Sequence, residues 1–243
     1  MATFKKNKYS ILKKVITKPI ASFVSDYFLL KRQVCRTFID HRYVSPYSLE
    51  WGVFGDTQVR SYSAYGDCAM DTLLEQVRPK IEKHLGFELV PTCSYSRIYQ
   101  RGDKLSRHKD RFSCEVSATM HLGGNRWPIY IDPTGSDNIL RGSFSKERGH
   151  EVTLKENAPP GVKINLNQGD MLIYSGCDLE HWREPLLKEK CIQVFFHYNR
   201  KGTKVAEDNK YDRRPHLGLP ATFCEEKEGV PTEPKYAGFY TND

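Results

Sequence analysis

The feature that most constrains the fold is a change of residue pattern near Val90. From there on, short segments rich in β-branched and aromatic residues alternate with Gly, Pro, Asn and Asp, which is typical of strands joined by turns. The segments are SYSRIYQ, SRHKD, CEVSATMHL, WPIYID, EVTLK or VKINL, DMLIYS, LEHWRE and QVFFHYN. The pattern before Val90 is helical. We therefore expect an α+β fold, in which N-terminal helices support a jelly roll (double-stranded β-helix) of about eight strands.

Two helices are predicted before this change. The first lies within IASFVSDYFLLKRQVCRTFIDH, where one apolar stripe has helical spacing. The stripe consists of Phe23, Tyr27, Leu30, Val34 and Phe38. The second helix should begin after Asp67, a suitable N-cap, and stop at Gly86. Pro79 should kink or divide it.

The length of 243 residues allows one domain with a substantial core. We assign residues 1–89 to a helical support within that domain and residues 90–199 to the jelly-roll core. Residues 200–243 are polar and rich in Pro and Gly, and they predict an extended C-terminal strap. We expect about the last dozen residues of this strap to be mobile.

Composition narrows the class of protein. The seven cysteines are widely spaced and include no Cys-x-x-Cys pair, so we expect reduced thiols rather than disulfides or a zinc site. The N-terminus MATFKKNKYSILKKVITKPI lacks the continuous apolar block of a secretory signal, and no run approaches the ~18 residues of a membrane span. We predict a cytoplasmic protein without a membrane segment. The net charge of +7 is spread along the chain, so nucleic acid is not the expected partner.

A candidate metal site lies in the stretch YQRGDKLSRHKD. Its His108 and Asp110 are two residues apart, so in a strand both side chains point to one face, roughly 6.5–7 Å apart at Cα. His181, downstream in LEHWRE, is a third candidate ligand. Two histidines and one carboxylate are the ligands of non-haem iron(II) oxygenases. A His-x-Asp by itself is a common tripeptide, and two solvated strand residues are the alternative.

The residues around this site extend the pattern. The spacing Tyr99-x-x-Gly102-x-x-x-x-x-His108-x-Asp110 resembles the signature of the prolyl 4-hydroxylase-like branch of the iron(II)- and 2-oxoglutarate-dependent dioxygenases. As in that family, a basic residue, Lys190, follows the distal His181 at nine residues. The resemblance covers roughly residues 90–198. It implies that the two histidines and Asp110 bind iron(II) and form the catalytic centre.

The resemblance also implies a site for the co-substrate 2-oxoglutarate. Lys190 would pair with its distal carboxylate. Arg183 is the alternative, because it lies two residues beyond His181 on the same strand face. Tyr99 would donate its hydroxyl to the same carboxylate, and Thr119 would line that part of the site. Dioxygen is the second co-substrate of the family, and we expect ascorbate to stimulate the reaction.

The implied activity is hydroxylation of an unactivated C–H bond, with release of succinate and carbon dioxide, on a prolyl residue of a peptide or protein. A free amino acid or another small metabolite stays open as the substrate. Oxidative demethylation of nucleic acid is a further alternative, but the paired arginines that mark that branch are not found after the distal histidine. Asp110 favours hydroxylation over halogenation. A jelly-roll binding module without turnover is the non-enzymatic alternative. The sequence leaves the oligomeric state open.

Overall fold

The computed structural model of the chain describes residues 2–45, 48–55, 59, 61–145 and 149–225. The helices are α1 (Ala2–Asn7), α2 (Lys18–Asp40), α3 (Cys68–Leu85) and α4 (Lys204–Asp208), with two short 3₁₀ segments, η1 (Lys210–Arg213) and η2 (Ala221–Phe223). The strands are β1 (Tyr9–Leu12), β2 (Val53–Phe54), β3 (Tyr62–Tyr65), β4 (Leu89–Gln100), β5 (Leu105–His108), β6 (Val116–Gly124), β7 (Ile129–Ile131), β8 (Ile139–Ser145), β9 (Gly149–Leu154), β10 (Val162–Ile164), β11 (Met171–Ser175), β12 (His181–Arg183) and β13 (Lys190–Arg200).

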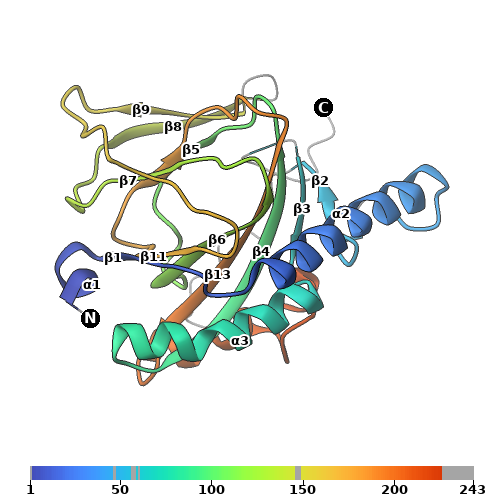
Figure 1. Cartoon of the computed structure of the whole chain (residues 1–243), viewed down its shortest axis with the longest axis horizontal. Helices are drawn as coiled ribbons and strands as arrows, with labels where there is room; N and C mark the ends of the chain where they lie inside the picture. The colour runs from blue at the N-terminus through green and yellow to red at the C-terminus, as the bar shows by residue number, and fades with distance from the viewer. Residues whose placement is uncertain (1, 46–47, 56–58, 60, 146–148, 226–243) are drawn as a thin grey trace.

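The strands form two main sheets that are joined into a jelly roll (Figure 1). The large sheet has the order β1-β11-β6-β13-β4-β3-β2, and the small sheet has the order β10-β7-β12-β5. Strands β4, β6, β11 and β13 belong to the large sheet, and β5, β7, β10 and β12, which lie between them along the chain, belong to the small one. A chain that alternates in this way between two antiparallel sheets forms a double-stranded β-helix. The predicted α+β jelly roll is confirmed, and β8 and β9 form a separate hairpin.

Helices α2 and α3 cover one face of the large sheet (Figure 1). Alternation along β13 shows which side chains face them. Ile192, Val194 and Phe196 belong to the core that the sheet shares with the two helices. Cys191 and Phe195 belong to a different cluster on the other face. Residues of a strand alternate between its faces, so odd-numbered positions of β13 face the small sheet.

Helix α3 has the predicted ends. The side chain of Asp67 accepts hydrogen bonds from the first backbone N–H groups of the helix, and Gly86 ends it with φ of +81°. The helix continues through Pro79, so of the two predicted effects, a kink or a division, the division is wrong. Buried Val77 and Ile81 pack on both sides of the proline and hold the two halves in one helix.

For α2, the predicted buried stripe is wrong in its register. Phe23 and Leu30 are 73% and 60% exposed, whereas Val24 and Phe28 are buried. The Phe28 ring packs 5.2 Å from that of Tyr62 on β3. Apolar residues lie on two adjacent sides of this helix, and the position of the sheet determines which side is buried.

Residues outside the jelly roll extend and fasten it. Strand β1 pairs with β11, and β3 pairs with β4, so the N-terminal part contributes strands as well as helices. The C-terminal part contains α4, which was not predicted, and is held to α3 by a buried ion pair between Arg214 and Asp71 at 3.2 Å. The last dozen residues, predicted to be mobile, lie outside the described residues.

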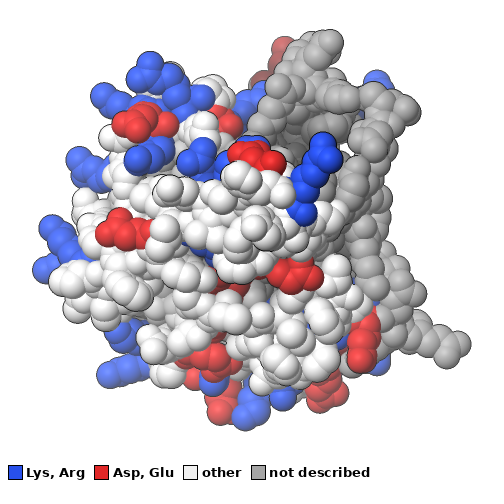
Figure 2. Space-filling view, turned by 90° about the vertical axis from the view of Figure 1, so that its right-hand side faces the viewer, with Lys and Arg blue, Asp and Glu red and all other residues white. Residues whose placement is uncertain are grey.

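The cysteines are unpaired, and charged side chains of both signs lie on the surface (Figure 2). All seven cysteines are free thiols. On the face shown in Figure 2, basic and acidic side chains are interspersed among uncharged ones. None of the helices in the described ranges combines the length and the apolar character that crossing a bilayer requires.

Candidate metal centre

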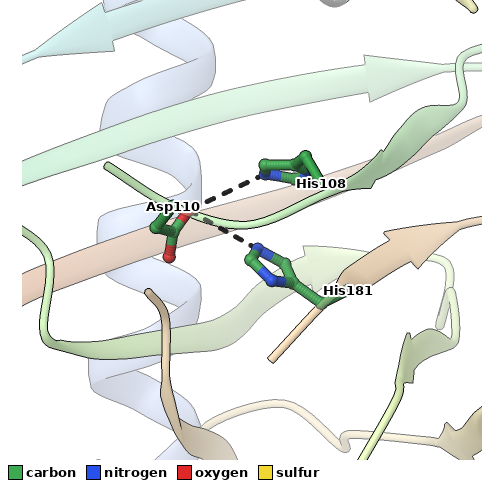
Figure 3. A group of neighbouring side chains, drawn as sticks. All are labelled: His108, Asp110 and His181. Carbon is green, nitrogen blue, oxygen red and sulfur yellow. Dashed lines mark ion pairs between the residues drawn. The ribbon is translucent and has the colours of Figure 1, made fainter. Parts of the chain in front are cut away.

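The structure brings His108, Asp110 and His181 together (Figure 3). His108 ends β5, His181 begins β12, and the two are direct partners in the small sheet. Their Nε2 atoms lie 3.7 Å and 3.5 Å from Oδ1 of Asp110. One ligand atom from each of the three residues lies within 4.8 Å of the others. The arrangement provides two nitrogens and one oxygen that converge on one point.

Backbone carbonyls fix the orientation of both imidazoles. Nδ1 of His108 lies 2.8 Å from the carbonyl oxygen of Ser106, and Nδ1 of His181 lies 3.0 Å from that of Leu179. A carbonyl only accepts hydrogen bonds, so each Nδ1 carries a proton. When such a ring is neutral, its lone pair is on Nε2, and in both residues Nε2 faces Asp110. A hydrogen bond from the other ring nitrogen to a backbone carbonyl is common for histidines that bind metals.

The charges of the site also suit a divalent cation. Burial by itself would raise the pKa of Asp110, but the nearby His181, His197 and His108 outweigh it and keep that pKa far below its usual range. Burial, together with the neighbouring His181, lowers the pKa of His108 to about 4. Near neutral pH, Asp110 is therefore ionised and His108 is neutral. Two imidazoles and one carboxylate fit iron(II).

Because Gly176 has no side chain, the Asp110 carboxylate can lie close to its backbone. This glycine was not identified from the sequence. The backbone N–H of Asp110 donates to the carbonyl of Gly176 at 2.9 Å. A Cβ at Gly176 would collide with Oδ2 of Asp110, with Oγ of Ser117 and with the carbonyl of Cys114. The sequence signal was a glycine five residues before His181 in SGCDLEH, which alone does not show how close Asp110 comes.

A buried ion pair lies behind the two histidines. Arg107 and Glu180 each precede a site histidine, and they meet at 2.7 Å on the other side of β5 and β12. Arg107 also pairs with buried Asp132 at 2.6 Å. Sequence reasoning missed this network, because nothing in the local pattern indicates that these charges are buried together.

Two of the residues predicted to bind the co-substrate lie together in the interior. Arg183 is 1% exposed and donates from Nη2 to Oγ1 of Thr119 at 3.3 Å and from Nη1 to the carbonyl of Trp127. The Tyr99 ring packs 4.7 Å from that of Trp127, which places this third predicted residue beside the same group. Burial lowers the pKa of Arg183. Its Nε is buried without a partner, and no carboxylate of the described residues pairs with it.

The structure does not bring Lys190 to this group. Lys190 opens β13, and the next residue, Cys191, is the one that faces the small sheet. The Lys190 side chain is 42% exposed, with Nζ 3.7 Å from Glu189. Strand alternation therefore turns Lys190 away from the interior, and Arg183, the predicted alternative, is the buried one of these two candidates.

Comparisons with known proteins agree with this fold. No family model and no curated protein matches the sequence. Among solved structures, a prolyl-4-hydroxylase of Pseudomonas putida is 16% identical, with a TM-score of 0.50, over 83% of this chain and 97% of that chain. A prolyl hydroxylase of Trichoplax adhaerens, solved in complex with a hypoxia inducible factor peptide fragment, is 15% identical, with a TM-score of 0.53, over 81% of each chain.

A third structure matches over more of the chain. The non-heme alpha ketoglutarate dependent epimerase SnoN from nogalamycin biosynthesis is 13% identical, with a TM-score of 0.56, over 96% of this chain and 93% of that chain. SnoN has also been solved with Fe³⁺, alpha ketoglutarate and nogalamycin RO. The chain shares its jelly-roll fold with these three proteins.

Proposed function

We propose that the protein is an iron(II)- and 2-oxoglutarate-dependent dioxygenase of the prolyl 4-hydroxylase-like branch, which hydroxylates an unactivated C–H bond. The observation that carries this proposal is the convergence of two Nε2 lone pairs and one carboxylate oxygen on one point. His108, Asp110 and His181 would hold the iron. When bound, iron and 2-oxoglutarate supply the oxidising chemistry, and the protein positions the reactants and excludes water.

Arg183 is the residue that we propose for the distal carboxylate of 2-oxoglutarate. A buried guanidinium without an acidic partner is costly, and an anionic ligand would offset that cost. Thr119 accepts a hydrogen bond from Arg183 and so holds its guanidinium in place. Tyr99 lies beside the same group and would add its hydroxyl. We assign no role in co-substrate binding to Lys190.

We propose a prolyl residue of a peptide or protein as the first substrate to test. The fold shared with two prolyl hydroxylases, one of them solved in complex with a peptide fragment, supports this choice. A small molecule is the second candidate, because SnoN has the same fold and was solved with nogalamycin RO. Mass spectrometry of proline-containing peptides and of metabolite mixtures after incubation should reveal a gain of one oxygen.

The enzyme proposal itself can be tested without a known substrate. Under anaerobic conditions, Fe(II) and 2-oxoglutarate should give the visible iron-to-keto-acid charge-transfer band, and succinate should form once oxygen and ascorbate are added. Asp110→Ala should abolish both signals. Asp137→Ala, which removes a carboxylate with an 83% exposed side chain, is the matched control and should leave both unchanged. Failure to detect 2-oxoglutarate binding by calorimetry or by the band would refute the proposal.

A further inference from the structure

Two polar side chains near Asp110 bind neither the metal nor the co-substrate in the site as proposed above. Oγ of Ser117, on β6, lies 2.5 Å from Oδ2 of Asp110. Nδ1 of His197, on β13, lies 3.0 Å from the same Ser117 oxygen. Ser117 and His197 are direct partners across these neighbouring strands. Three side chains thus form one hydrogen-bonded line that ends at the candidate metal centre.

The protons in this line have only one consistent direction. A carboxylate only accepts hydrogen bonds, and Oδ2 of Asp110 lies 2.5 Å from the Ser117 hydroxyl. The Ser117 hydroxyl therefore donates to Oδ2. Its oxygen then accepts from His197, so Nδ1 of His197 carries a proton.

The two oxygens of Asp110 consequently have different environments. Oδ1 faces the Nε2 atoms of His108 and His181 at 3.7 Å and 3.5 Å. Oδ2 accepts a hydrogen bond from Ser117 and lies so close to Gly176 that a Cβ there would collide with it. We propose that Ser117 and His197 are positioning residues, which hold Oδ2 of Asp110 and leave Oδ1 as the single oxygen offered to the metal.

This inference rests on the proposed function, because it requires a metal between the three ligands. Its chemical consequence concerns the number of open positions. A carboxylate that offered both oxygens would occupy one position more, at the expense of the co-substrates. By holding Oδ2, Ser117 keeps that position available. His197 fixes the Ser117 hydroxyl in the direction that this role requires.

Cobalt(II) alone, added to the full chain, is the probe for the test. Ser117→Ala and His197→Phe break the line, whereas His197→Asn retains an N–H group that can reach Ser117. Ser96→Ala is the control, because it removes a buried hydroxyl without a partner from β4. We expect the two disruptive variants to bind cobalt about 10–100-fold more weakly. They should also absorb less visible light per cobalt, because an additional oxygen ligand lowers the intensity of its bands.

His197→Asn and Ser96→Ala should keep the cobalt spectrum and affinity of the wild type. A wild-type spectrum and affinity in Ser117→Ala would overturn the inference. Should that variant fail to fold, the comparison between His197→Phe and His197→Asn decides, and equal spectra would overturn the inference. A wild-type protein that binds no cobalt would refute the proposed metal centre and the positioning role together. A wild type that binds cobalt with an unaffected Ser117→Ala would refute only the positioning role.

Discussion

Arg107 and Glu180 each stand one residue before a site histidine, and their side chains form a 2.7 Å ion pair on the opposite side of β5 and β12. Because residues alternate between the two faces of a strand, this pair points away from the candidate metal centre while the histidines point toward it. Asn138 donates to both Glu180 and Asp132 and completes the network. The ion pair therefore sets the relative position of the two strands that carry the histidines.

Arg107→Met should destabilise the fold strongly. It leaves the carboxylates of Asp132 and Glu180 buried without their cation, which typically costs about 3–5 kcal/mol. Urea unfolding at neutral pH measures this loss. Lys109→Ala is the control on the same segment, because the Lys109–Asp137 pair is partly exposed and should contribute less than about 1 kcal/mol. Similar losses in the two variants would contradict the assigned role of the buried pair.

Arg183→Met should weaken the binding of 2-oxoglutarate without lowering the stability of the ligand-free protein. We expect 2-oxoglutarate to bind about 10–100-fold more weakly, since a charge-assisted hydrogen bond is worth about 1.5–3 kcal/mol. The ligand-free protein should be as stable as the wild type or more so, because the variant removes a buried charge without an acidic partner. Calorimetry with the metal-loaded protein and urea unfolding measure the two effects. Lys190→Ala should change the affinity less than twofold, and the reverse order would return the role to Lys190.

Stability should fall as the pH is lowered from 6.5 toward 4, in part through His121. Burial, helped by the charges of Arg183 and Arg126, lowers the pKa of His121 from 6.5 to about 4. In this window the unfolded chain binds a proton that the folded protein excludes, so the free energy of unfolding decreases by about 1.4 kcal/mol per pH unit for this group. Above pH 6.5 the contribution is fully present.

Urea unfolding between pH 4.5 and 7 tests this, with His121→Asn as the comparison. The variant should show a shallower dependence, smaller by about one proton, while His108 retains its own contribution in the same direction. The same slope in the variant and the wild type would mean that His121 is not kept neutral by the fold.

Gly176→Ala should weaken metal binding more than it weakens the fold. The added methyl would displace Asp110 or Ser117, so we expect at least a tenfold loss of cobalt affinity. Gly102→Ala is the control, because it adds a methyl in a turn with φ of +94° and nothing within 4 Å. It should cost about 1 kcal/mol of stability through the backbone alone and leave cobalt binding unchanged. Equal cobalt affinities in both variants would exclude the predicted collision.

The sequence predicted those features that depend on local pattern. The ends of α3 follow from its capping residues, Asp67 and Gly86. The jelly roll follows from strand-like segments of similar length. The grouping of His108, Asp110 and His181 follows from the family resemblance; strand β5 ends at His108, and Asp110 lies two residues beyond it.

Features that depend on long-range packing were not predicted. The buried side of α2 is chosen by the sheet rather than by the helix, so Phe23 was assigned wrongly. Lys190 has the right spacing from His181 but lies on the wrong face of β13, which only the strand register reveals. Ser117 and His197 come from separate strands, and no local spacing relates them to Asp110.

The pairing of His108 with His181 joins segments that are far apart in the chain. We expect such a contact to form late in folding, because contacts of long sequence separation are slow to form. Iron held by these residues would therefore add to the barrier against unfolding without lowering the barrier to folding. When iron is scarce, the protein should therefore fold at the same rate but unfold more often, which would expose it to proteolysis more often.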